Sequence, residues 1–314
     1  MQAVVYERTG GPEVLTFGEV PDPEPADGAV LVDVAAVGVN FRDVYEREGR
    51  PPYTADPPAV IGVEGAGTVA GTGERVAWLD VRGSYAQRLA APREKLVPVP
   101  DGVGLDVAAA VMLQGCTAQY LVTDSYPVAE GDWAVVHSAA GGVGLLLTQL
   151  VRARGGHVLA TTSTEDKAEL ARAAGADEVV VGYTGFAERV RELSGGEGAA
   201  VVYDGVGRTT FDAGLTALRP GGRMILYGAA SGQPEPLELH RLAGAGSLFV
   251  QRPTLATYTR TPELLRRLAG AVLESVAAGR LDVRIGARLP LAEARRGHED
   301  LEARRTTGKL LLLP

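Results

Sequence analysis

Apolar residues in the C-terminal half of the chain form short continuous runs, separated by segments with a helical period. Six such runs lie at residues 133–137, 157–161, 178–181, 200–203, 223–227 and 247–250. Helical patterns separate most of them, for example over 144–154 and 165–174, and Gly175 is suited to end the second of these helices. Continuous apolar strands are typical of a parallel sheet that helices cover on both faces. The pattern therefore predicts an α/β domain over residues 118–262 with a doubly wound parallel sheet, the Rossmann fold.

The first part of the chain shows a different pattern, in which glycine and proline break up short strands. Strands are predicted at residues 2–6, 29–34, 75–79 and 84–90, with a glycine-rich strand pair over 60–69. Helix signals are sparse before residues 105–113. Closely spaced strands of this kind predict a partly closed β-barrel over residues 1–117. The tail, residues 263–314, has a helical pattern over 263–278 and then β-like segments, so we expect it to rejoin the first domain.

The amino-acid composition of the chain mainly serves to exclude classes of function. The chain has 314 residues, of which 46% are apolar and 22% charged, as in soluble globular proteins of about two domains. A single cysteine, Cys116, excludes an intrachain disulfide. The net charge of −8 argues against nucleic acid as the main partner. No leader segment or membrane span is evident in the sequence, so we expect a cytoplasmic protein that acts on small molecules.

The sharpest motif follows the first of the six apolar runs. Residues 135–144 read Val-Val-His-Ser-Ala-Ala-Gly-Gly-Val-Gly, which departs from G-x-G-x-x-G by having alanine at the first position. Gly141 would let the backbone approach a pyrophosphate, and Gly144 would let the following helix pack closely on the strand. The N-terminus of that helix offers unpaired N–H groups to the phosphates. The motif predicts a dinucleotide cradle made by four residues: Ala140, Gly141, Gly142 and Val143.

The end of the second apolar run indicates which dinucleotide binds. An NAD site places a carboxylate there to hold the ribose 2′-hydroxyl. This chain has Thr161-Thr162-Ser163-Thr164 instead, followed by Lys167. Hydroxyl groups and an ammonium can bind the 2′-phosphate of NADP, which a carboxylate would repel. We therefore expect NADPH, with Thr162, Ser163 and Lys167 at its 2′-phosphate.

No metal site is predicted. The four histidines lie at residues 137, 157, 240 and 298, and none has a second ligand at metal spacing. Cys116 has no cysteine or histidine neighbour, and no G-x-S-x-G nucleophile motif occurs. The cofactor must therefore supply the difficult chemistry.

Six motifs spread over nearly the whole chain carry a family resemblance. They lie at residues 10–15, 37–43, 61–67, 139–144, 202–207 and 306–309. Together they resemble the quinone oxidoreductases, the zeta-crystallin-like, zinc-free branch of the medium-chain dehydrogenase/reductase superfamily. The resemblance implies a GroES-like substrate domain before the Rossmann domain, an active site in the cleft between them, and a homodimer formed through an edge strand near residues 249–251.

The resemblance also assigns residues to parts of the site. Asn40 and Tyr45 are implied to be catalytic, with Thr117 near the nicotinamide. Tyr183 and Arg304 are implied to join Lys167 at the adenosine phosphate. The remaining residues implied to line the cofactor groove are Gly205, Val206, Gly228, Ser231, Phe249, Val250 and Gln251.

Three functions follow from these observations. The leading hypothesis is NADPH-dependent reduction of a quinone, which needs mainly proximity and orientation. The alternative is reduction of an activated C=C bond in an enone, alkenal or enoyl thioester, where Tyr45, Tyr53 or water would deliver a proton. The third is a binding or structural role without turnover.

Overall fold

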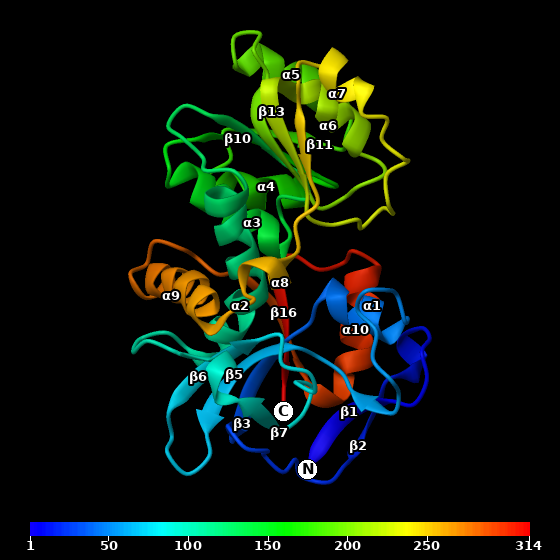
Figure 1. Ribbon diagram of the computed structural model, residues 1–314, viewed down its shortest axis with the longest axis vertical. Coiled ribbons are helices and arrows are strands. Elements are labelled where there is room, and N and C mark those ends of the chain that lie inside the picture. The colour runs from blue at the N-terminus through cyan, green and yellow to red at the C-terminus, as the bar shows by residue number, and fades with distance from the viewer. The chain divides into compact units, whose positions relative to one another are not determined.

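The computed structural model describes residues 1–314 and divides into two compact units (Figure 1). Unit 1 comprises Met1–Cys116 and Arg260–Pro314, and unit 2 comprises Thr117–Thr259. The C-terminal segment thus belongs to the same unit as the N-terminal one.

Unit 2 is built on a six-stranded parallel sheet. Its strands are β9 (Trp133–Val136), β10 (His157–Thr162), β11 (Glu178–Val181), β12 (Ala199–Asp204), β13 (Leu218–Leu226) and β14 (Phe249–Gln251). Their spatial order is β11-β10-β9-β12-β13-β14, and every neighbouring pair is parallel. This is the doubly wound order, in which the direction of winding reverses between β9 and β12. The predicted fold class is confirmed, and β13 begins five residues earlier than residue 223, where the sequence predicted it.

Helices cover both faces of this sheet because right-handed connections that run in opposite directions along a sheet fall on opposite faces. Helices α3 and α4 lie together, and α5 and α6 lie together (Figure 1). The helices of unit 2 are α3 (Gly142–Arg152), α4 (Glu165–Ala173), α5 (Phe186–Leu193), α6 (Phe211–Ala217), α7 (His240–Gly244) and α8 (Leu255–Tyr258). A buried apolar cluster between sheet and helices includes Leu159, Phe186, Val202 and Met224.

Unit 1 contains two β-sheets. The smaller has the order β2 (Thr16–Glu19), β1 (Gln2–Tyr6) and β4 (Ala59–Val60). The larger has the order β15 (Ile285–Pro290), β16 (Lys309–Leu313), β3 (Ala29–Gly38), β5 (Glu64–Val69), β6 (Arg75–Leu79) and β8 (Leu96–Pro98), with β7 (Arg88–Pro92) also paired to β3. The tail therefore enters the large sheet through β16. The GroES-like, partly closed β architecture is confirmed.

Two strand predictions in unit 1 need correction. Residues 60–69 do not form one strand pair, because β4 and β5 belong to different sheets. Gly62 interrupts the run with a φ of +96°, and a Cβ there would lie 2.1 Å from the ring of Tyr85. The strand predicted over 84–90 begins only at Arg88, because the backbone before it pairs elsewhere: Tyr85 donates its N–H to the carbonyl of Ile61, and its carbonyl accepts from the N–H of Val4. The Ser84 hydroxyl accepts a hydrogen bond from Trp78, and the Tyr85 hydroxyl donates one to Asp43.

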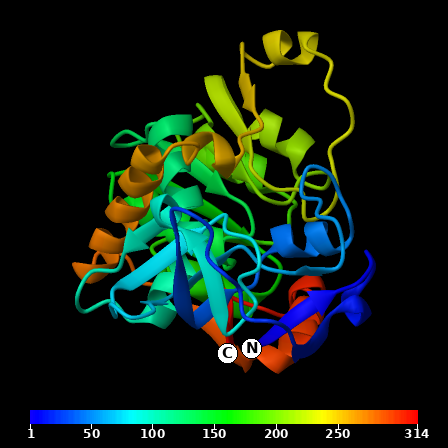
Figure 2. The same cartoon turned by 60° about the horizontal axis from the view of Figure 1, so that its bottom comes forward.

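The helices of unit 1 pack around the two sheets. They are α1 (Phe41–Arg47), α9 (Pro262–Ala277) and α10 (Ala294–Glu302), with short helical turns η1 (Pro12–Val14), η2 (Arg93–Lys95) and η4 (Leu291–Glu293). Helix α2 (Leu105–Tyr120) runs from unit 1 into unit 2 and continues as a π-helical turn, η3 (Leu121–Ser125). The chain's ends lie beside each other in unit 1 (Figures 1 and 2).

The helical signal at residues 105–113 is the start of a longer apolar helix than the sequence indicated. Leu105–Ser125 spans 21 residues with a mean hydropathy of 1.3, enough by length and composition to cross a membrane. However, 67% of this segment is buried inside the protein. We therefore interpret it as a core helix, which passes the same test.

Candidate dinucleotide-binding and active-site residues

The loop that joins β9 to α3 has a tightly fixed backbone. Gly141 donates its N–H to the carbonyl of Ser138 at 2.9 Å, and Ala139 donates to the carbonyl of Thr161 on β10 at 3.1 Å. Ser138 has a φ of +53°, which few residues other than glycine adopt. Gly141 caps α3 in an extended conformation. The loop thus delivers the first turn of α3, with its unpaired N–H groups, at the carboxyl end of β9.

The two outer glycines of this loop differ in the space around them. A Cβ on Gly144 would lie 2.5 Å from the carbonyl oxygen of Ser138 and 2.6 Å from Cα of Ala139. A Cβ on Gly141 would meet only the carbonyl oxygen of Ser138, at 3.2 Å. Gly144 is therefore needed for packing of the helix on the strand, whereas Gly141 faces open space. Such a surface can admit a pyrophosphate close to the backbone.

The residues predicted for the 2′-phosphate lie around the carboxyl end of β10. Thr162 is buried and donates its hydroxyl to the carbonyl of Thr164 at 3.1 Å. Ser163 is exposed, and Lys167 is half-buried in the first turn of α4. Tyr183 lies after β11, and its hydroxyl is 3.5 Å from the Ser138 hydroxyl of the glycine-rich loop. The fold thus brings Tyr183 to the phosphate loop, 45 residues earlier in the chain. Arg304 lies in unit 1.

A buried histidine supports this end of the loop. His137 is 0% exposed, and its Nδ1 is 2.8 Å from the Thr161 hydroxyl. Its ring packs edge-on against Phe186 and Tyr183. Burial lowers the pKa of His137 to about 4, and the Asp204 carboxylate offsets part of this shift. The ring is therefore neutral near pH 7.

Asp204, at the end of β12, fixes the second loop of the site. Its Oδ1 accepts hydrogen bonds from the backbone N–H groups of Val206 at 2.7 Å and Gly207 at 3.0 Å, and its Oδ2 accepts from the Thr210 hydroxyl at 2.8 Å. Sequence reasoning missed this residue, although an aspartate directly after a buried apolar strand is a signal for such a role.

The residues predicted after β12 and β13 approach one another. Gly228 and Gly205 lie so close that a Cβ on Gly228 would be 2.7 Å from the Gly205 carbonyl oxygen. Ser231 donates its hydroxyl to the Val206 carbonyl and accepts from the N–H of Thr209. The Ser231 hydroxyl therefore links the segment after β13 to the loop that follows β12.

Phe249, Val250 and Gln251 form β14, the edge strand of the unit 2 sheet. Gln251 donates to the Tyr258 hydroxyl at 2.9 Å, and its Oε1 is buried without a partner. Phe249 is 55% and Val250 37% exposed.

In unit 1, Asn40 belongs to a buried polar cluster. Its Oδ1 accepts from Lys309 Nζ at 2.8 Å and from Gln114 Nε2 at 2.7 Å. Its Nδ2 donates to Glu64 at 2.7 Å and to the Gly38 carbonyl at 3.2 Å. Since an amide has two donor and two acceptor sites, all four are used inside the unit.

Lys309 is the cation of this cluster and is 3% exposed. Burial lowers its pKa, and the neighbouring Glu64 carboxylate opposes that shift. The sequence analysis assigned no role to Lys309, Glu64 or Gln114. The available signal was a charged residue within an apolar strand, as Lys309 is at the start of β16.

Asn40 also caps α1 in a capping box with Asp43, whose Oδ2 accepts from the Asn40 N–H at 3.0 Å. Burial raises the pKa of Asp43 to about 7, against the opposing effect of Arg42, Lys309 and the Tyr85 hydroxyl. Tyr85 hydrogen-bonds to Asp43 and lies 3.3 Å from Nε2 of His298. A buried polar chain thus holds the start of the helix.

Tyr45, two residues further along α1, is half-buried. Its ring stacks on that of Tyr53 with 6.1 Å between centroids, and Arg50 lies over its face at 5.8 Å. Thr117, at the start of unit 2, is 7% exposed.

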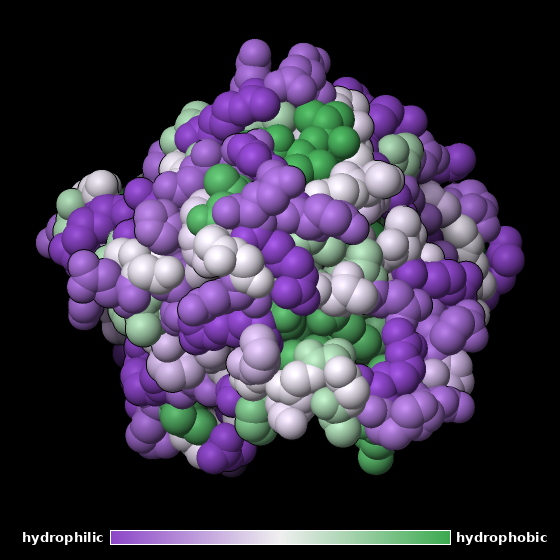
Figure 3. All heavy atoms as spheres, turned by 90° about the horizontal axis from the view of Figure 1, so that it is seen from above, coloured by the Kyte–Doolittle hydropathy of each residue, from purple (hydrophilic) through white to green (hydrophobic).

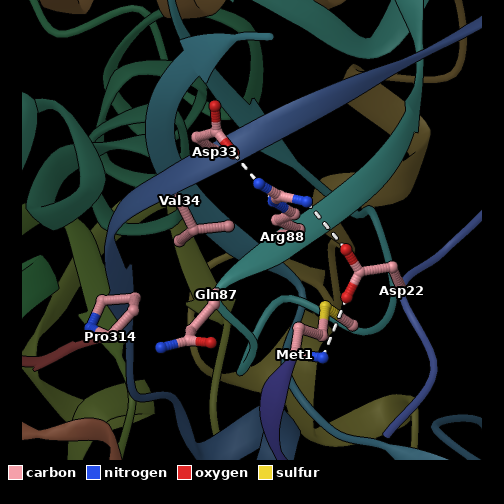
Figure 4. Close-up of a pocket in the computed structure, with 7 residues that line it drawn as sticks. All are labelled: Met1, Asp22, Asp33, Val34, Gln87, Arg88 and Pro314. Carbon is pink, nitrogen blue, oxygen red and sulfur yellow. Dashed lines mark hydrogen bonds and ion pairs between the residues drawn. The ribbon is translucent and has the colours of Figure 1, made fainter.

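A shallow pocket in unit 1 lies where the two chain ends meet (Figure 4). Arg88 pairs with Asp22 at 2.7 Å and Asp33 at 3.1 Å, and Asp22 also pairs with the Met1 amine at 2.8 Å. These charges neutralise one another. We do not place the active site there.

The chain is similar to known oxidoreductases over its full length. Residues 26–101 match the family described as "Alcohol dehydrogenase GroES-like domain", and residues 142–270 match that described as "Zinc-binding dehydrogenase". A quinone oxidoreductase of Pseudomonas aeruginosa is 40% identical, with 99% of each chain covered. A 2-haloacrylate reductase of Burkholderia is 38% identical, with 100% of this chain and 99% of that protein covered. The solved structure of a mycobacterial protein in complex with NADPH is 44% identical, with both chains fully covered and a TM-score of 0.95.

The donor set of this chain does not fit the zinc ion implied by one of these descriptions. Nowhere among the 314 residues do three His, Cys, Asp or Glu side chains gather at metal-binding distance. The buried polar cluster of unit 1 offers one carboxylate and two amides around an ammonium. Zinc prefers thiolate and imidazole ligands. The proposed function therefore uses no metal ion.

Proposed function

Because the chain belongs to the quinone oxidoreductase, zeta-crystallin-like family of the medium-chain dehydrogenase/reductase superfamily, we propose that it reduces quinones with NADPH and without zinc. It is an oxidoreductase enzyme. The observation that carries the proposal is the β9–α3 loop, whose Gly141 leaves its backbone open to a pyrophosphate beside the N-terminus of α3.

The residues of unit 2 fit NADPH as the cofactor. The backbone of Ala140, Gly141, Gly142 and Val143 binds the pyrophosphate, and the loops held by Asp204 and Ser231 border the groove. Thr162, Ser163, Lys167 and Tyr183 bind the 2′-phosphate. When bound, NADPH supplies the hydride or electrons.

We assign the substrate to unit 1. Residues 1–117, with the returning segment 263–314, form the substrate domain, and residues 118–262 the cofactor domain. Asn40 and Tyr45 serve the substrate side, and Thr117 lies near the nicotinamide. Since the Asn40 amide is saturated within unit 1, Asn40 acts by fixing the start of α1. Tyr45 is the residue of α1 whose side chain carries a hydroxyl group.

A second activity, reduction of an activated C=C bond, is favoured by the similarity to a 2-haloacrylate reductase. This reaction needs a proton for carbon as well as a hydride, whereas a quinone is already strongly electrophilic. The stacked pair Tyr45 and Tyr53 provides a candidate donor.

Initial rates of NADPH oxidation test both activities. The purified enzyme is assayed with 1,4-naphthoquinone, a 2-enoyl thioester and 2-chloroacrylate. Under the proposal, kcat/KM is highest for the quinone among the three substrates, because its reduction requires no proton transfer to carbon. A higher kcat/KM for either alkene substrate reassigns the enzyme to the second activity. NADPH binding without turnover on any of them leaves a binding or structural role.

The cofactor preference has its own test. Lys167→Ala should weaken NADPH binding about 10-fold or more, because a charge-assisted contact to the 2′-phosphate is lost, while NADH affinity changes little. Arg172→Ala on the same helix is the matched control, since Arg172 already pairs with Glu165 at 2.7 Å. Equal losses of NADPH and NADH affinity in Lys167→Ala refute the assignment.

We further propose a cytoplasmic homodimer. Hydrophobic residues form a few separate clusters on the largely polar face seen in Figure 3. The exposed side chains of Phe249 and Val250 lie on the edge strand β14, whose outer side is unpaired within the unit. An apolar edge of this kind favours pairing with a second copy.

A further inference from the structure

The most unusual feature outside the dinucleotide loop is an ammonium enclosed by oxygen atoms. Lys309 Nζ donates to Asn40 Oδ1 at 2.8 Å, Gln114 Oε1 at 2.8 Å and Glu64 Oε2 at 2.9 Å. Asn40 immediately precedes α1, and Gln114 lies within α2. Glu64 begins β5, and Lys309 begins β16. We infer that Lys309 is an internal cation that substitutes for a metal ion and positions α1 for the reaction.

The fold reserves space for this cation. Gly38, at the end of β3, has no side chain, and a Cβ there would lie 2.5 Å from Lys309 Cε and 2.6 Å from Nζ. Glu64 is 0% and Asn40 3% exposed. An ammonium has three N–H donors, and all three are used. Lys309 thus has no hydrogen left for a substrate, so it is a positioning residue and not a catalytic one.

The effect of the cation passes to α1 through Asn40. Lys309 and Gln114 fix Asn40 Oδ1, and Glu64 and the Gly38 carbonyl fix its Nδ2. The Asn40 N–H then donates to Asp43 and starts the helix. Tyr45 lies one turn further on. This role in the reaction rests on the proposed function, since it assumes that α1 serves the substrate.

If Lys309 formed only a conventional ion pair, it would neutralise the charge of Glu64 and do nothing more. Two variants distinguish this role from the positioning of Asn40. Lys309→Ala removes the ammonium and leaves a space bounded by one carboxylate and two amide oxygens. Lys309→Met with Glu64→Gln keeps the volume and restores neutrality, but removes the cation that holds Asn40. Lys95→Ala is the control, because Lys95 is a half-buried lysine of the same unit whose Nζ lies 3.9 Å from Asp80 Oδ2.

Chemical rescue is the decisive experiment. Lys309→Ala should lose on the order of 10- to 100-fold in quinone kcat, as expected for misplaced catalytic groups. It should also unfold at a lower temperature, followed by the fluorescence of Trp78 of unit 1 in a Trp133→Phe background. NADPH affinity, which belongs to unit 2, should stay unchanged. Methylammonium at tens of millimolar should restore both kcat and the melting temperature, whereas tetramethylammonium, which has no N–H donors, should restore neither.

Each outcome is informative. Full kcat in the Met/Gln double variant means that only charge neutrality matters and overturns the positioning role. Failure of methylammonium to raise the melting temperature of Lys309→Ala overturns the cation site itself. Should Lys309→Ala fail to fold, the kcat of the double variant relative to that of the wild type still tests the positioning role. Should the wild-type enzyme reduce no quinone, the proposed function fails, yet the thermal rescue still tests the cation site.

Discussion

Two glycines of the β9–α3 loop should respond to substitution in opposite ways. At Gly144, an added Cβ lies 2.5 Å from a carbonyl oxygen and 2.6 Å from a Cα, both of the backbone. That is roughly 1 Å inside van der Waals contact, and backbone atoms cannot move aside as a flexible side chain can. Gly144→Ala should therefore destabilise unit 2 by about 1–3 kcal/mol, the usual cost of overpacking.

At Gly141 the only close neighbour is one carbonyl oxygen, 3.2 Å from the added Cβ. Gly141→Val should therefore change the free energy of unfolding by less than about 1 kcal/mol. Its isopropyl group would occupy the space that the pyrophosphate needs. We expect the Kd for NADPH to rise at least about 100-fold, a loss of about 2.8 kcal/mol of binding free energy.

The two effects can be measured separately. Isothermal titration calorimetry gives the Kd for NADPH. Urea unfolding gives the stability of unit 2 when followed by the fluorescence of Trp133, which starts β9. The chain has two tryptophans, so a Trp78→Phe background leaves Trp133 as the only reporter.

Gly244→Ala is the matched control, because it adds the same methyl group to a helix of unit 2 where nothing lies within 4 Å. It should leave stability and affinity unchanged or slightly raise stability. NADPH affinity within twofold of wild type in Gly141→Val would mean that the pyrophosphate binds elsewhere. Wild-type stability in Gly144→Ala would contradict the loop conformation.

Three further predictions concern single groups. Because burial lowers the pKa of His137 to about 4, the folded state favours the neutral ring. Unit 2 should therefore lose up to about 1.4 kcal/mol of stability per pH unit as the pH falls from 6.5 to about 4. In urea titrations, His137→Phe should flatten this dependence of stability on pH, and an unchanged slope would assign it to other groups. Val250→Lys places a charge on the exposed edge strand β14 and should convert the proposed dimer to monomers in light scattering; a persistent dimer would exclude this edge as the interface. Burial raises the pKa of Cys116, which is 0% exposed, so a thiol reagent should label it only as fast as the protein unfolds, and rapid labelling in native buffer would contradict its placement in the core.

Much of the fold could be predicted because its signals are local. The six strands of unit 2 are visible as continuous apolar runs, and the glycine-rich loop is contiguous in sequence. The boundaries of β4 and β5 could not be predicted in the same way. They depend on Gly62, whose left-handed backbone makes room for the ring of Tyr85, 23 residues later.

The roles of single site residues were less accessible. Asp204 acts on backbone N–H groups two and three residues away, so its role could in principle be found from sequence. Lys309 acts on Asn40 across 269 residues, and no local pattern reveals that contact. The family resemblance implied that Asn40 is catalytic, but only the hydrogen bonds show that its amide is fully occupied.

The sequence alone determined that a parallel sheet carries a phosphate-binding turn, because strand burial and turn geometry depend on residues close together in the chain. Only the tertiary structure decided which polar side chains meet in the interior. A buried charge must find its partners wherever the fold places them, and those of Lys309 lie on three separate segments of unit 1. The enclosure of the Lys309 ammonium by carboxylate and amide oxygens is therefore a property of the folded chain.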